Sequence, residues 1–117
     1  MPKAKANIAP INEREIAENL LELGFNPSQK GYHYMIKAVS LRVKDPLGGL
    51  YATVYEPIAD IYKERPQNIE RGIRHAIQCT HNKGNDAWVD LCSDRAKPPN
   101  GWAISLIAEI HRLKAAG

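Results

Sequence analysis

The chain has 117 residues, of which 44% are hydrophobic and 25% charged, with a net charge of +3 and two cysteines. This length fits one domain with its own core, the composition is ordinary for a globular protein, and two cysteines are too few for a disulfide framework. The sequence has no apolar run long enough for a signal peptide or a membrane span, so we expect a cytoplasmic protein with reduced thiols.

The N-terminal part divides into a flexible basic arm at residues 1–11 and a folded domain at residues 12–117. Asn12 is predicted to cap the first helix, because its side chain can accept hydrogen bonds from free backbone donors. Gly24 is predicted to end that helix in a left-handed conformation. Ser28 is then predicted to cap a second helix.

The middle of the chain is divided by prolines and glycines. The run at 45–49 predicts a turn, and a short helical stretch follows it. Pro57 is predicted to interrupt that stretch and to open a new helix, which stops near Lys63. Pro66 opens the next helix, and Gly84 with Asn85 ends it.

The C-terminal part predicts a short helix at 86–91, an irregular connector at 95–101 and an apolar-rich helix after it. No segment shows the sustained alternation of a strand. The sequence therefore predicts an all-α fold of about six helices.

Positive charge is concentrated in one segment, residues 63–85. This segment holds five Lys or Arg and two Glu, and the excess of three equals the net charge of the whole chain. Such a concentration is typical of a surface that binds a polyanion.

The predicted helix at 66–83 has two distinct faces. One face is apolar or small and suited to packing on the domain: Ile69, Ile73, Ala76, Ile77 and Thr80. The opposite face is polar, with two further residues at its edges: Gln67, Arg71, Arg74 and Gln78, flanked by Glu70 and His75. Arg and Gln make paired hydrogen bonds to guanine and adenine, and Glu accepts from the cytosine amino group, so this face is suited to reading bases.

A short helix at 56–63 and a turn at 64–66 precede this polar helix. A helix, a tight turn and a second helix with a polar outer face form the layout of a helix-turn-helix. Ala59 is small where the two helices are expected to cross. The glycine usual in such a turn is missing, and Lys63 or Glu64 stands in its place.

Four blocks of sequence resemble a known family, in order and at near-constant spacing. The blocks are Lys30-Gly31-Tyr32-x-Tyr34, Tyr55-x-x-Ile58-Ala59, the run 69–77 followed by Lys83-Gly84-Asn85, and Ala96-Lys97-Pro98-x-Asn100. Together they resemble the C-terminal DNA-binding domain of the sporulation master regulator, stage zero sporulation protein A, over about residues 12–115.

The resemblance implies a six-helix effector domain that regulates transcription by binding double-stranded DNA at short boxes, often as a head-to-tail homodimer. RNA polymerase is a second candidate partner. The family matches Glu70 and Arg71 to base reading, Arg74 and His75 to the backbone, and Lys83 and Lys97 to positions close to DNA. The full set that we expect to bind DNA is Gln67, Asn68, Glu70, Arg71, Arg74, His75, Gln78, Lys83 and Lys97.

Three departures from the family lie in this region. Gln67 and Asn68 replace a Ser-Arg pair, the turn at 64–66 replaces a threonine-rich one, and Gly72 replaces an alanine. The target box can therefore differ from that of the family. The chain also starts at the effector domain without the family's receiver domain, so it is an excised domain or a natural stand-alone module, and the short segment before the domain favours the second.

The alternative hypothesis is a helical protein-interaction module that modulates a full-length regulator or RNA polymerase without binding DNA. A zinc site built from His75, Cys79, His81 and Cys92 is not expected, because the spacing matches no common zinc pattern. The five tyrosines are scattered over several helices, which favours packing over base stacking. No catalytic motif and no cofactor fingerprint occurs in the sequence, so an enzyme is not expected.

Overall fold

The structure is a computed structural model that describes residues 12–93 and 96–116. The described residues form helices and no strands, which confirms the all-α prediction. The elements are α1 (Glu13–Leu23), α2 (Lys30–Lys44), the π-helical turn η2 (Tyr51–Tyr55), α3 (Glu56–Tyr62), α4 (Pro66–Lys83), α5 (Asp86–Cys92) and α6 (Asn100–Ala116). The predicted basic arm at 1–11 lies outside the described residues.

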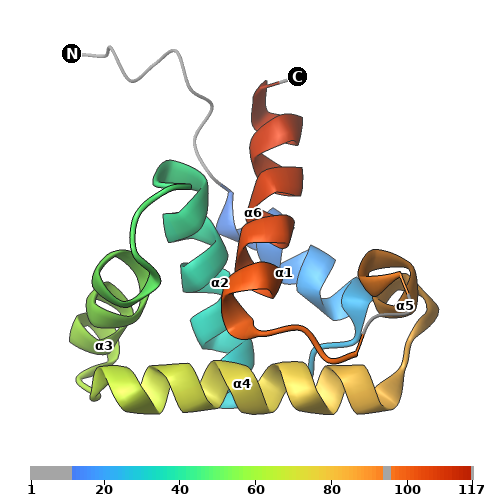
Figure 1. Cartoon of the computed structure of the whole chain (residues 1–117), viewed down its shortest axis with the longest axis horizontal. Coiled ribbons are helices and arrows are strands. Elements are labelled where there is room, and N and C mark those ends of the chain that lie inside the picture. Colours follow the sequence, from blue (N-terminus) through green and yellow to red (C-terminus); the bar gives the residue numbers. More distant parts are fainter. Residues whose placement is uncertain (1–11, 94–95, 117) are drawn as a thin grey trace.

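Helix α4 runs along the base of the molecule, and the other helices pack above it (Figure 1). Helix α2 is central, because it contacts α1, α4 and α6. Helices α3 and α5 lie at the two ends of α4. The core is mostly aliphatic, and Trp88 is its largest fully buried side chain.

The ends of α1 confirm the sequence prediction, whereas the start of α2 corrects it. Asn12 Oδ1 accepts from the backbone N–H of Arg14 at 2.9 Å, and Gly24 ends the helix with φ 105°. Ser28 does not cap α2, because Gln29 is the N-cap. The Asn26 side chain instead accepts from both the backbone N–H and the hydroxyl of Ser28, and holds Ser28 in the preceding turn.

Pro57 does not break the chain into two helices as predicted. The backbone stays in the right-handed helical region through Tyr55 and Glu56, and the Glu56 N–H donates to the carbonyl of Tyr51, five residues back. A π-helical turn therefore continues directly into α3, and the missing N–H of Pro57 falls in the first turn, where it is tolerated.

Helices α2 and α4 touch through their backbones at Gly31 and Gly72. A Cβ on Gly31 would lie 2.2 Å from the carbonyl oxygen of Gly72, and a Cβ on Gly72 would lie 2.9 Å from the ring of Tyr34. Both positions thus lack a side chain for a packing reason. The contact holds the start of α2 directly against the first half of α4.

Candidate nucleic-acid interface

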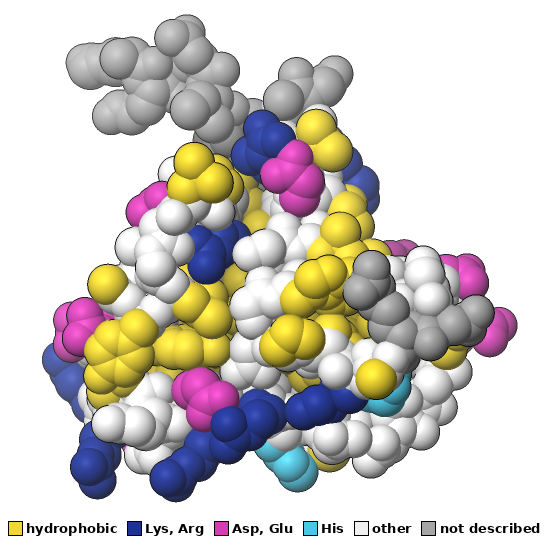
Figure 2. Space-filling view, in the orientation of Figure 1, with side chains coloured by type: hydrophobic (Ala, Val, Ile, Leu, Met, Phe, Trp, Pro, Cys, Tyr) yellow, Lys and Arg dark blue, Asp and Glu magenta, His cyan; other side chains and the backbone are white. Residues whose placement is uncertain are grey.

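The two faces of α4 are oriented as the sequence predicts. All five residues of the apolar stripe are at most 2% exposed: Ile69, Ile73, Ala76, Ile77 and Thr80. The polar face is open to solvent, with Gln78 partly buried. Figure 2 shows that Lys and Arg side chains gather along the lower edge of the molecule, where α4 lies.

The connection between α3 and α4 is short and tightly held. Lys63 adopts the left-handed conformation, with φ 58° and ψ 46°, so it is the residue that stands in the place of the usual glycine. The Glu64 N–H donates to the carbonyl of Ala59 at 2.9 Å. Ala59 is 4% exposed, as expected for a close crossing. This geometry is consistent with the predicted helix-turn-helix.

Three hydrogen bonds within this surface engage predicted site residues. Arg74 Nη1 donates to Glu70 Oε2 at 2.6 Å. Asn68 Nδ2 donates to Glu64 Oε1 at 2.9 Å, and Gln78 Nε2 donates to Asn82 Oδ1 at 2.9 Å. Exposed pairs of this kind on helices stabilise by only about 0.2–0.5 kcal/mol, so they rearrange at low cost when a ligand binds.

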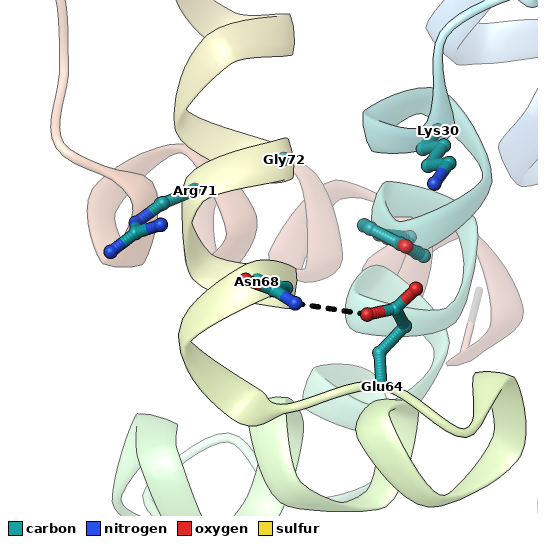
Figure 3. Close-up of a pocket in the computed structure, with 6 residues that line it drawn as sticks. Lys30, Glu64, Asn68, Arg71 and Gly72 are labelled. Atoms are coloured by element: carbon teal, nitrogen blue, oxygen red, sulfur yellow. Dashed lines mark hydrogen bonds between the residues drawn. The ribbon is translucent and has the colours of Figure 1, made fainter.

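Arg71 differs from its neighbours on this face. Its side chain is exposed and makes no hydrogen bond or ion pair with any described residue. Its guanidinium points away from α2, on the other side of α4 from Lys30 (Figure 3). An unpaired guanidinium keeps all five of its N–H donors available to a ligand.

Sequence reasoning missed the role of Asn100, the first residue of α6. Its Nδ2 donates to the backbone carbonyl of Glu70 at 3.0 Å and to the Tyr55 hydroxyl at 3.1 Å, and the residue is 9% exposed. The partly buried Lys97 lies only three residues earlier. Asn100 therefore ties the loop that carries Lys97 to α4, next to Arg71. The only hint in the sequence is that Asn100 belongs to the fourth block of the resemblance.

Three of the four residues considered as zinc ligands, His75, Cys79 and His81, make contacts that do not converge on one point. His81 Nδ1 accepts from Trp88 Nε1 at 3.0 Å, while Cys79 Sγ lies 3.4 Å from Gln29 Nε2 and 3.6 Å from His75 Nε2. In residues 12–93 and 96–116, no three His, Cys, Asp or Glu side chains come together as a metal site.

Most tyrosines are packed, as predicted. Tyr32, Tyr34 and Tyr55 are at most 6% exposed, whereas Tyr51 is 50% and Tyr62 is 38% exposed. Burial, more than any neighbouring charge, raises the pKa of Tyr55. These side chains therefore serve the core more than a binding surface.

The predicted residues on α4 extend over a large part of the helix. From Gln67 to Lys83 the rise is about 24 Å, whereas the major groove of DNA is about 12 Å wide. The predicted residues on α4 therefore extend over about twice the width of that groove.

A family model described as the C-terminal part of the sporulation initiation factor Spo0A matches residues 16–110. The match includes all nine predicted site residues. Across the described part of the chain, no helix has the length and apolar character needed to cross a membrane.

Proposed function

This chain belongs to the family of Spo0A C-terminal domains, a DNA-binding regulatory family and not an enzyme family, and from that premise we propose that it binds specific double-stranded DNA sequences as a transcription regulator. Helix α4 lies in the major groove with its polar face toward the bases. The observation that carries this proposal is the exposed, unpaired guanidinium of Arg71, on the face of α4 opposite its buried stripe.

The roles follow from position along α4. The first residues of a recognition helix meet base edges, so Gln67, Glu70 and Arg71 read bases, whereas Asn68, which bonds Glu64 beside α2, lies next to the backbone. The residues farther along the helix hold the backbone, together with the loop that Asn100 ties down: Arg74, His75, Gln78, Lys83 and Lys97. Glu70 keeps its Oε1 free to accept from a base while its Oε2 stays with Arg74.

The test starts with a random-site selection, which identifies the preferred duplex without assuming a box. Fluorescence anisotropy at several salt concentrations then compares that duplex with a scrambled one of equal length. We expect Arg71→Ala to lose about 1–3 kcal/mol, or about 5- to 150-fold in affinity, on the selected duplex and to relax the choice at one base pair.

Arg14→Ala is the matched control, because Arg14 is an exposed arginine on α1 that pairs with Glu18 at 3.6 Å. It should leave discrimination unchanged. An Arg71→Ala protein with full affinity and full discrimination would contradict the assignment. Weak binding by the wild type that is equal for both duplexes and vanishes with salt would favour the protein-interaction module instead.

Head-to-tail pairing on repeated boxes and contact with RNA polymerase remain proposals that rest on the family resemblance. Pairing predicts that a duplex with two selected boxes binds two copies more tightly than two separate boxes do. The stoichiometry and the affinity can be measured in one titration of the two-box duplex.

A further inference from the structure

A hollow of about 280 Å³ lies between the start of α2 and the first half of α4. It is lined by Lys30, Tyr34, Glu64, Asn68, Arg71 and Gly72. Figure 3 shows that the side chains of Lys30, Glu64 and Asn68 point into it. A second hollow of about 250 Å³ shares Lys30, Tyr34 and Glu64 and extends toward α3.

Two hydrogen-bond donors in this hollow have no partner among the described residues. Lys30 is exposed and forms no ion pair, although Glu64 lines the same hollow. Tyr34 is 4% exposed, and its ring packs against Tyr62 at 5.1 Å between centroids. The Tyr34 hydroxyl makes no hydrogen bond to any described residue. The ring is buried, but the hydroxyl oxygen is not among the buried unpaired polar atoms of the described residues, so it reaches the hollow and can donate to a ligand there.

The charge state of these donors suits an anionic ligand. Burial, then the nearby Glu64 and Tyr62, raises the pKa of Tyr34, so its hydroxyl stays protonated and can donate at neutral pH. The N-cap residue of α2, Gln29, makes no side-chain hydrogen bond to the first turn. The positive end of this 15-residue helix dipole therefore adds to the charge of Lys30.

We propose that this hollow holds a phosphate of the DNA backbone, with Lys30 and the Tyr34 hydroxyl donating to its oxygens. This inference rests on the proposed function, because it requires α4 to lie in the major groove. The Gly31–Gly72 contact fixes the start of α2 against α4, so Lys30, which lies 41 residues before Arg71 in the sequence, reaches the same DNA.

The hollow and the Lys97 loop flank α4 on opposite edges. By helical spacing, Asn68 and Gly72 lie along the edge that faces α2, whereas Glu70 and Arg74 lie along the other. Asn100 holds its loop to that second edge through the carbonyl of Glu70. A helix in the major groove has a DNA backbone on either side. In this arrangement Lys30 lies next to one backbone and Lys97 next to the other.

The test measures how affinity depends on salt. Neutralising one phosphate contributes about 0.9 to the slope of log affinity against log salt. We expect Lys30→Ala to lower that slope by about 0.9 and to weaken selected and scrambled duplexes by the same factor. Lys30→Gln, which keeps the aliphatic stem, should give the same change in slope and controls for lost packing.

Lys44→Ala is the matched control, since Lys44 is an exposed lysine at the other end of α2, about 21 Å away by helical rise. Its slope should equal that of the wild type. Tyr34→Phe keeps the buried ring and should cause a smaller loss of affinity, equal for both duplexes. Glu64→Gln removes a negative charge from the hollow while it can still accept from Asn68, and should tighten binding to both duplexes.

This inference would be overturned if the Lys30→Ala and Lys44→Ala proteins had the same slope of log affinity against log salt. If the wild type discriminates between the duplexes and Arg71→Ala loses that discrimination, the proposed function stands while the phosphate site fails. If the wild type does not discriminate and its weak binding vanishes with salt, the proposed function fails first, and the phosphate site fails with it.

Discussion

Replacing Asn100 by Ala tests how the Lys97 loop is held against α4. The substitution removes the donor to the Glu70 carbonyl at 3.0 Å and to the Tyr55 hydroxyl at 3.1 Å. Both bonds join segments that are far apart in the chain, and no backbone hydrogen bond between α4 and α6 replaces them in the described residues.

The expected loss of stability follows from the two bonds. Each contributes about 1 kcal/mol, and the Tyr55 hydroxyl, in a residue 6% exposed, loses this partner inside the protein. We therefore expect Asn100→Ala to lower the free energy of unfolding by about 2–4 kcal/mol in urea denaturation. Tyr55→Phe removes only one bond and should cost about 1 kcal/mol. Because Asn100 and Tyr55 are in contact, the two losses should not add in the double variant.

The same substitution should also change DNA binding. Once its anchor is lost, the loop no longer holds Lys97 close to α4, so Lys97→Ala should cost less affinity in the Asn100→Ala background than in the wild type. Asn82→Ala is the control, because Asn82 is exposed and only accepts from Gln78 at 2.9 Å. It should change stability by less than about 0.5 kcal/mol. A loss below about 1 kcal/mol for Asn100→Ala, with an undiminished effect of Lys97→Ala, would refute the reasoning.

Three further substitutions test other parts of the fold. Gly31→Ala should lower the free energy of unfolding by about 2 kcal/mol or more in urea denaturation, because a Cβ 2.2 Å from the Gly72 carbonyl forces α2 and α4 apart; unchanged stability would contradict this contact. Lys63→Gly should raise the melting temperature, because a non-glycine residue in the left-handed region costs about 1 kcal/mol; a lower one would argue against strain in the turn. His111→Gln should flatten the pH dependence of stability. Burial, then Lys114, lowers the pKa of His111 below its ordinary 6.5, so the neutral form is favoured in the folded state. Wild-type stability is therefore full above pH 6.5 and falls as the pH drops toward the folded pKa, and equal slopes for both proteins in parallel urea titrations would exclude this role.

The faces of α4 could be predicted from the sequence because they depend on the helix alone. A helix repeats every 3.6 residues, so the spacing of Ile69, Ile73 and Ile77 places them on one side and Arg71 on the other before any contact is known. The ends marked by Asn12 and Gly24 were predictable for the same reason, since caps act within one turn.

Predictions from short sequence patterns were wrong where another interaction competes with the one that the pattern indicates. Ser28 has the right chemistry for an N-cap, but Asn26 binds its backbone and hydroxyl first. Pro57 was expected to break the helix, but the packing of Val54, Tyr55 and Ile58, each at most 6% exposed, carries the backbone through a π-helical turn instead.

The tertiary structure determines which residues of other helices lie beside α4 on the surface. Gly72 has no room for a side chain because of a contact with a helix about 40 residues earlier, and the bond from Asn100 to Glu70 spans 30 residues. Such contacts depend on how whole helices pack, which no spacing within one helix reports. The sequence by itself thus determined that α4 presents Arg71 to solvent, opposite its buried stripe, whereas the packing of α2 and α6 against α4 decided that Lys30 and the Lys97 loop lie beside it.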